Sequence, residues 1–138
     1  MNKKNQDQLI KKAAEAARKS YAPYSKLRVG AALLTARGRR ILTGCNVENA
    51  SFGLAICAER AALAAAVAAG FRRFEAIAVV ASGRKAIVPC GACLQALAEF
   101  CGPDFPVIIG NTNSSEGVRV YQLRDLLPHV FRLDSDKR

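Results

Sequence analysis

The chain has 138 residues, a formal net charge of +10 and hydrophobic residues at 51% of its positions. This length is enough for one domain with a packed core and excludes several, so we expect a single domain over residues 1–138. The apolar content excludes a disordered chain. The longest apolar run, residues 61–69, is too short to span a membrane, and no apolar leader follows Met1. We therefore expect a cytoplasmic protein without membrane contact.

Positive charge is concentrated in the first 40 residues, where eleven Lys and Arg residues stand against Asp7 and Glu15. Such a segment could bind nucleic acid or an anionic surface. No row of aromatic residues alternates with these charges to stack on bases. We therefore interpret them as a solvated helix face and a basic hairpin, and expect no nucleic-acid partner.

The first half of the chain predicts two helices that flank a hairpin. Apolar residues at helical spacing predict an amphipathic helix over residues 6–19. Two β-rich segments, residues 27–36 and 41–47, predict strands joined by a glycine-containing turn at residues 37–40. An alanine-rich segment predicts a second helix over residues 57–69, because a glycine follows it.

The second half predicts alternating strands and helices. Residues 74–81 predict a buried strand, and residues 90–100 predict a helix with a proline just before it. Short strands at residues 107–110 and 118–121 and a brief helix at residues 125–128 follow. Strands that alternate with helices indicate one α/β sheet covered by helices.

Three of the five cysteines form a pattern that indicates a metal site. Cys57 stands at the start of the second helix, and Cys90 and Cys93 stand at the start of the third. An odd cysteine count in a reducing compartment disfavours a disulfide framework. Cys45 and Cys101 lie outside the pattern, and we interpret them as small buried hydrophobic residues.

Three cysteines supply three ligands, the number typical of a catalytic zinc site that keeps one position for water. The only histidine, His129, stands beside a proline near the C-terminus without ligand spacing. Backbone N–H groups at the start of each helix would favour the thiolate form of the cysteines. Arg60, three residues after Cys57, is placed to donate hydrogen bonds to the sulfurs and balance their charge.

Glu59 lies two residues after Cys57, so its carboxylate can face the open position of the metal without being a ligand. There it could take a proton from the attacking water and pass it to a leaving amine. A lone glutamate in a first turn would only compensate the helix dipole, but the adjacent cysteines favour the catalytic role. Cys-x-Glu followed by Pro-Cys-x-x-Cys is close to the general zinc-deaminase signature, with cysteine in place of its histidine.

The sequence resembles the small homotetrameric cytidine deaminases over nearly its whole length, from about residue 9 to residue 131. The matching segments are Tyr21-Ala22-Pro23-Tyr24-Ser25-Lys26, Val29-Gly30-Ala31-Ala32-Leu33, Gly44-Cys45-Asn46-Val47-Glu48-Asn49-Ala50, Cys57-Ala58-Glu59-Arg60 and Pro89-Cys90-Gly91-Ala92-Cys93. The resemblance implies a three-layer α/β/α fold around a mixed five-stranded sheet, with one Zn²⁺ ion per chain. It also implies a homotetramer with shared active sites.

The resemblance further implies hydrolytic deamination of cytidine or deoxycytidine to uridine or deoxyuridine, with release of ammonia, in pyrimidine salvage. Glu59 would hold the base at N3 as well as move protons. Asn46 and Glu48 would bind the ribose 3′-hydroxyl, and the Ala58 backbone would contact the pyrimidine. Phe131 would reach the active site of a neighbouring subunit. An anionic Glu48 also favours a nucleoside over a nucleotide, because it would repel a phosphate.

Three positions depart from the family pattern. Leu27 replaces a phenylalanine that packs on the base, Leu94 replaces an arginine after the last cysteine, and Phe52 replaces a common tyrosine near the sugar. Leucine keeps an apolar wall but loses an aromatic face worth about 1–3 kcal/mol in stacking. The same chemistry on N4- or ring-substituted cytidines, or on a nucleoside antibiotic, is therefore a second hypothesis.

Two further hypotheses remain, and the second of them comes from a different class of protein. The charge of +10 would suit a polynucleotide-editing deaminase, but the chain has little length beyond a catalytic core. The other is a non-catalytic zinc-binding protein, against which Glu59 and the missing fourth ligand argue.

Overall fold

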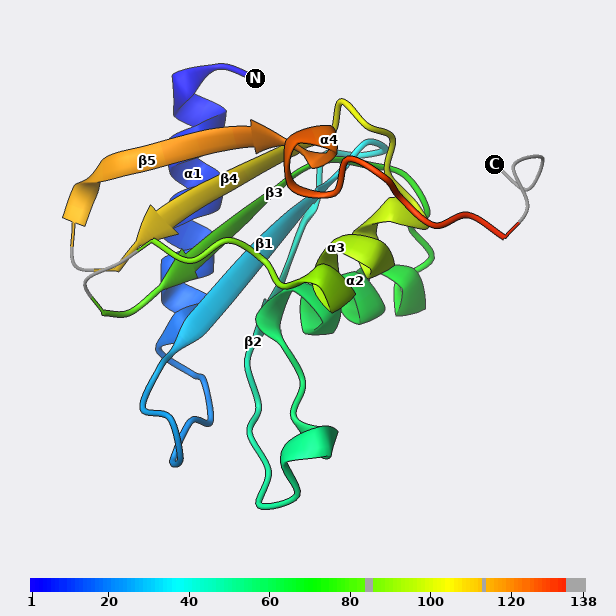
Figure 1. Ribbon diagram of the computed structural model, residues 1–138. Coiled ribbons are helices and arrows are strands. Elements are labelled where there is room, and N and C mark those ends of the chain that lie inside the picture. Colours follow the sequence, from blue (N-terminus) through cyan, green and yellow to red (C-terminus); the bar gives the residue numbers. More distant parts are fainter. Residues whose placement is uncertain (84–85, 113, 134–138) are drawn as a thin grey trace.

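A computed structural model of the protein describes residues 1–83, 86–112 and 114–133 (Figure 1). These ranges contain five helical segments, one of them a 3₁₀ turn, and five strands. In chain order they are α1 (Lys3–Ala17), β1 (Val29–Thr35), β2 (Ile41–Cys45), η1 (Phe52–Leu54), α2 (Ala58–Ala68), β3 (Phe74–Ala81), α3 (Gly91–Ala98), β4 (Pro106–Asn111), β5 (Ser114–Gln122) and α4 (Leu123–Leu126). Within the described ranges, no helix combines the length and the apolar character that a membrane crossing needs.

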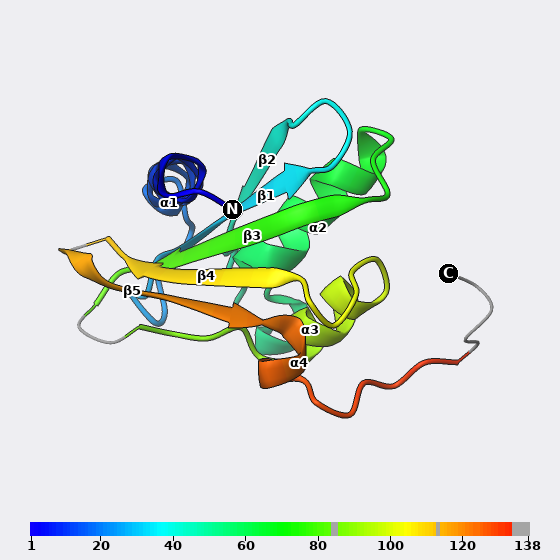
Figure 2. The same cartoon turned by 90° about the horizontal axis from the view of Figure 1, so that it is seen from above.

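The five strands form one mixed sheet in the order β2-β1-β3-β4-β5. Strands β3 and β4 are parallel, and the other neighbouring pairs are antiparallel. A parallel pair needs a crossover connection, which contains α3. Helix α1 covers one face of the sheet, and α2 and α3 cover the other (Figure 2). The predicted three-layer α/β/α architecture with a mixed five-stranded sheet is confirmed.

Each face of the sheet has its own core, because alternate residues of a strand point to opposite faces. In β1, Ala31 and Leu33 pack beneath α2 and α3, whereas Ala32 and Leu34 pack beneath α1. All four side chains are at most 3% exposed. A strand covered on both faces is hydrophobic at consecutive positions, which explains the apolar runs at residues 29–34 of β1 and 76–81 of β3.

Two glycines allow the helices to approach the sheet closely. A Cβ atom on Gly44 of β2 would lie 2.4 Å from the backbone nitrogen of Ala62 and 2.6 Å from the carbonyl oxygen of Ala58, both in α2. On the other face, a Cβ atom on Gly30 would lie 1.9 Å from the carbonyl oxygen of Ala13 in α1. Any larger residue would push the helices outward, so Gly44 sets the position from which α2 presents its first turn.

The element boundaries differ from the prediction where local hydrogen bonds decide them. Helix α1 starts at Lys3, three residues early, because the Asn2 side chain accepts a hydrogen bond from the Asn5 backbone N–H at 2.8 Å. Strand β5 is longer than predicted, because its pairing with β4 extends the short apolar segment in both directions. The sequence gives no signal for η1, a single 3₁₀ turn in the loop before α2.

Candidate metal centre and active site

The three cysteines of the sequence pattern meet where α2 and α3 begin. The Sγ atoms of Cys57, Cys90 and Cys93 all lie within 4.8 Å of one another, and those of Cys90 and Cys93 are 3.6 Å apart. Zinc in a tetrahedral site, with Zn–S bonds of about 2.3 Å, holds its sulfur ligands about 3.8 Å apart. The spacing and the soft sulfur donors therefore fit zinc, as the sequence predicts.

The helix starts orient two of these cysteines. Cys57 is the N-cap residue of α2 and Cys90 that of α3, and neither side chain caps its own helix. Their sulfurs therefore stay available to a metal. Burial raises the pKa of the Cys90 thiol, but hydrogen bonds from the backbone N–H groups of Cys93 and Ala92 and from neighbouring thiols outweigh it, so this pKa is lowered.

Cys93 has the opposite environment, because its side chain is fully buried. Burial raises the pKa of its thiol, and the negative charges of Glu59 and Cys57 raise it further. Three thiolates this close to a carboxylate repel one another unless a cation lies between them. A divalent metal removes that cost, so the cluster fits a metal better than three unliganded thiols.

Arg60 and Leu94 lie beside the cluster in different roles. The Nη2 atom of Arg60 lies 3.5 Å from Cys57 Sγ, and hydrogen bonds to Cys57 and Cys93 raise the pKa of the guanidinium above its ordinary value. Leu94 is 4% exposed and packs in the core between the sheet and the α2–α3 layer. The donor to the sulfurs thus comes from α2, and the position after Cys93 contributes packing.

Glu59 lies in the first turn of α2 and is 5% exposed. Burial raises the pKa of its carboxyl, and hydrogen bonds from its own backbone N–H and the Cys93 thiol, with the charge of Arg60, only partly oppose this. A carboxyl with a raised pKa is suited to accept and release a proton near neutral pH.

A cavity of about 250 Å³ lies beside the cluster, and Glu59 is in its wall. The sequence-selected residues that line it with Glu59 are Asn46, Glu48, Cys57, Ala58 and Cys90. A second group of lining residues is apolar: Val29, Ala55, Ile56, Val79, Ile87 and Val88. An apolar wall with a few polar groups is typical of a small-molecule site.

The apolar part of this wall was missed by sequence reasoning. Val29 and Val79 belong to strands whose apolar residues all predict core, and nothing in the sequence separates a wall position from a core position. Two of these residues stand next to a motif that could have indicated them: Ile56 comes just before Cys57, and Val88 comes just before Pro89 and Cys90.

Glu48 is held by the loop that precedes β1. Its carboxylate accepts hydrogen bonds from the backbone N–H groups of Tyr24 and Ser25, at 2.9 and 3.1 Å, and from the Ser25 hydroxyl. The Ser25 hydroxyl is the main cause that lowers the pKa of Glu48 below its ordinary value. Glu48 is therefore an ionised, oriented hydrogen-bond acceptor at neutral pH.

Asn46 joins the same loop to the sheet. Its Oδ1 atom accepts a hydrogen bond from the Val29 backbone N–H, and its Nδ2 atom donates to the Leu27 carbonyl oxygen, both at 2.9 Å. The Asn46 amide thus lines the cavity and also holds the neighbouring wall segments in place. Any contact with a ligand uses the remaining hydrogen-bonding capacity of this side chain.

Three predicted substrate contacts are not in the cavity wall of the single chain. Leu27 is half-buried, and its contact with Asn46 is through the backbone. Phe52 is 76% exposed and meets the Tyr24 ring edge-on, with centroids 5.9 Å apart. Phe131 is 68% exposed, and its carbonyl oxygen accepts a hydrogen bond from Gln95 of α3.

Fold and site together define a class: a three-layer α/β/α protein with a three-cysteine metal centre and a buried glutamate beside it. Among the described residues, the ligand cluster consists of three cysteines, and His129 is not part of it. Three protein ligands leave one coordination position for water or substrate, which is typical of catalytic rather than structural zinc.

Comparison with known proteins identifies the family. Residues 3–109 match the family model described as the cytidine and deoxycytidylate deaminase zinc-binding region. The chain belongs to this family, which confirms the resemblance seen in the sequence.

Several relatives match over nearly their full length. Cytidine deaminase of Halalkalibacterium halodurans is 46% identical over 123 residues, 89% of this chain and 91% of that protein. Cytidine deaminase of Sporosarcina psychrophila is 43% identical over 125 residues, 91% and 90% of the two chains. The crystal structure of cytidine deaminase from Burkholderia pseudomallei superimposes with a TM-score of 0.84 at 47% identity, covering 95% of this chain and all of that one.

Proposed function

We propose that residues 1–138 form one catalytic domain that hydrolyses cytidine or deoxycytidine to uridine or deoxyuridine and ammonia, in pyrimidine salvage. The observation that carries the proposal is the position of Glu59, a buried carboxyl in a cavity wall that also contains Cys57 and Cys90. The names of the relatives support cytidine as the substrate.

Glu59 moves the protons of the proposed reaction. It takes one from the attacking water as the water oxygen bonds to C4 of the pyrimidine, and delivers a proton to N3. Glu59 then carries the proton of the new C4 hydroxyl to the amino group. The C4–N bond breaks, ammonia leaves with the bonding electrons, and the C4 oxygen becomes the carbonyl of the uridine product. When zinc is bound by the three sulfurs, the chemistry that it supplies is Lewis-acid activation of the attacking water. Arg60 holds the sulfurs and balances their charge.

The remaining site residues position the nucleoside. Glu48 and Asn46 bind the ribose 3′-hydroxyl, and the ionised Glu48 disfavours a 5′-phosphate in the same cavity. The Ala58 backbone contacts the pyrimidine at the start of α2. Leu27 and Phe52 lie outside the cavity wall of the single chain, and in this proposal they contact the nucleoside from the loops next to Glu48.

We further propose a cytoplasmic homotetramer in which Phe131 enters a neighbouring subunit's site. Large apolar side chains exposed on the single chain support an interface: Phe52 at 76%, Leu54 at 66%, Phe131 at 68% and Leu133 at 91%. A metal centre of three cysteines needs its thiols unoxidised, which a reducing compartment favours. Light scattering on the purified protein measures the oligomeric state directly.

Substitution of Glu59 tests the proposed function. Glu59→Gln keeps the size of the side chain and removes the proton acceptor, so we expect kcat for cytidine to fall about 10³-fold or more. Zinc should stay near one ion per chain by atomic absorption. Glu15→Gln, on the exposed face of α1, is the matched control and should keep full activity. Full activity of Glu59→Gln would overturn the assignment.

A substrate panel tests the second hypothesis, which Leu27 and Leu94 motivate. If kcat/KM is higher for cytidine and deoxycytidine than for N4-substituted cytidines, the proposed substrate is supported. A higher value for an N4-substituted nucleoside would favour the alternative substrate with the same chemistry.

A further inference from the structure

A second cavity, of about 670 Å³, lies at the opposite end of α2 from the cysteines. It is formed by the turn between β1 and β2, residues 36–40, and by the segment after α2, residues 69–73. Four arginines line it: Arg37, Arg40, Arg72 and Arg73. No residue of this wall belongs to the cavity beside the cysteines.

The β1–β2 turn is locked in one conformation. The buried Thr35 hydroxyl donates to the Arg37 carbonyl oxygen and accepts from the Arg40 backbone N–H, both at 2.8 Å. Gly38 and Arg39 have φ angles of +73° and +48°. Two successive positive φ angles are typical of the tight type I′ hairpin turn, and such a conformation is uncommon for arginine. The turn therefore presents its arginines from a preformed backbone.

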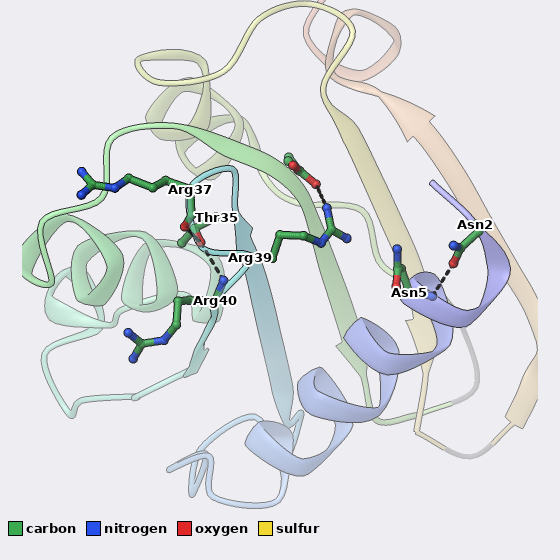
Figure 3. Close-up of polar contacts among 7 residues, drawn as sticks. Asn2, Asn5, Thr35, Arg37, Arg39 and Arg40 are labelled. Carbon is green, nitrogen blue, oxygen red and sulfur yellow. Dashed lines mark hydrogen bonds and ion pairs between the residues drawn. The ribbon is translucent and has the colours of Figure 1, made fainter.

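Arg39 and its neighbours point in different directions. Arg39 pairs with Glu75 of β3, whereas Arg37 and Arg40 leave the turn on the other side (Figure 3). The Arg40 guanidinium carbon lies 6.0 Å from the centre of the Phe71 ring. Within the described part of the chain, neither Arg37 nor Arg40 forms an ion pair with a carboxylate.

Arg72 removes an obstacle to anion binding. A helix C-terminus carries partial negative charge, which would repel an anion near Gly70. The Nη1 atom of Arg72 donates to the carbonyl oxygens of Val67 and Phe71, both at 2.9 Å. Its positive charge therefore offsets the end of α2 and leaves the cavity positive.

We propose that this arginine pocket, lined by Arg37, Arg40, Arg72 and Arg73, binds a small polyphosphate, either free or carried by a nucleotide. Guanidinium groups match phosphate oxygens in bidentate geometry and keep their charge at any physiological pH. The volume suits a small molecule. A nucleic-acid strand fits less well, because Phe71 is the only aromatic residue of the wall and Arg40 lies over its ring.

Isothermal titration calorimetry of the zinc-loaded protein with sodium tripolyphosphate tests this proposal. The double variant Arg37→Gln/Arg40→Gln should bind at least about tenfold more weakly than the original protein. The control Lys11→Gln/Arg119→Gln removes the same charge from α1 and β5 and should keep the original affinity. Thermal denaturation of both variants verifies that they are folded.

ATP as a second ligand separates the two sources of polyphosphate. Affinity for ATP equal to that for tripolyphosphate supports recognition of the phosphate chain alone, and tighter binding supports a nucleotide in the same pocket. The proposal is overturned if tripolyphosphate and ATP both fail to bind. It is also overturned if the control loses as much affinity as the pocket variant, or if a single-stranded oligonucleotide binds and tripolyphosphate does not. None of these measurements depends on deaminase activity.

Discussion

The two ends of α2 carry opposite chemistry on one helix. At its start, Cys57 is the N-cap residue and Glu59 lies in the first turn, so a sulfur and a carboxylate lie at the N-terminus of the helix. At its end, Arg72 donates to the Val67 carbonyl oxygen of the last turn, and the arginine pocket begins. Both ends complement the helix dipole, which favours anions at the N-terminus and cations at the C-terminus.

The groups at the two ends of α2 differ more in their burial than in the size of their charge. Glu59 and Cys93 are at most 5% exposed, and burial raises the pKa of both groups, which suits the proposed roles of proton carrier and metal ligand. Arg37 and Arg40 are exposed and remain charged cations. A buried ionisable group has a shifted pKa and can exchange a proton, whereas an exposed charged group can attract a ligand of opposite charge. One helix can therefore contribute to a reaction at one end and to a separate binding site at the other.

Loss of one metal ligand should have the largest effect, because it should abolish activity at the start of α2 and leave ligand binding at its end unchanged. Cys90→Ala leaves two sulfurs, so we expect zinc to be lost and cytidine turnover to fall by about 10³-fold or more. Tripolyphosphate binding at the other end should remain. Metal analysis, kinetics and calorimetry on one preparation check this outcome, and Cys45→Ala, outside the cluster, should keep its zinc. Loss of both functions in Cys90→Ala would show that the ends are not independent.

Displacement of α2 should lower the stability of the whole domain, and with it both ends of the helix. Gly44→Ala drives a Cβ atom into the α2 backbone at Ala58 and Ala62, so we expect the free energy of unfolding to fall by about 3 kcal/mol. Urea denaturation measures this change. Gly53→Ala is the control, because nothing lies within 4 Å of its added Cβ, and its effect should stay within about 0.5 kcal/mol. Equal stability of the two variants would contradict the close packing of α2 on β2.

Arg60 in α2 and Arg72 in the segment after it provide a matched pair of substitutions. Arg60→Gln removes a donor to Cys57 and should lower zinc affinity or activity about 10- to 100-fold. Arg72→Gln removes the bonds to the end of α2 and should cost about 1 kcal/mol of stability while activity is kept. Zinc competition with a chelator and thermal denaturation separate the two effects. Weaker zinc binding in Arg72→Gln would contradict the independence of the two ends of α2.

The smallest effect should be a pH-dependent one at Glu48. Its folded-state pKa is lowered, chiefly by the Ser25 hydroxyl, so the carboxylate stabilises the fold above its unfolded pKa. This contribution is lost as pH falls through the folded-state pKa, below the ordinary value of 4.5. Glu48→Gln should therefore melt at a lower temperature than the original protein at pH 7, with the gap closing in acid. A gap that is constant from pH 7 to acid would contradict this account.

Local patterns explain what could be predicted. Hydrophobic periodicity predicts α1, because a helix with one buried face repeats at a fixed spacing. Apolar β-rich segments predict the strands, and alanine content with flanking glycine or proline predicts the later helices that the described residues contain. The cysteine spacing indicates the metal cluster, because Cys57, Cys90 and Cys93 stand at helix starts where the chain must bring its first turns together. Boundaries set by a single side chain, such as Asn2 before α1, are less visible.

The sequence by itself determined the α/β order of elements and the residues of the proposed reaction: three soft ligands and a glutamate two residues from one of them. Only the tertiary structure decided what surrounds them. The apolar cavity wall draws Val29, Val79 and Val88 from separate segments, and the arginine pocket joins residues 37–40 to residues 69–73. Contacts between such distant segments depend on strand register and helix packing across the whole sheet, and no local spacing of residues in the chain predicts them.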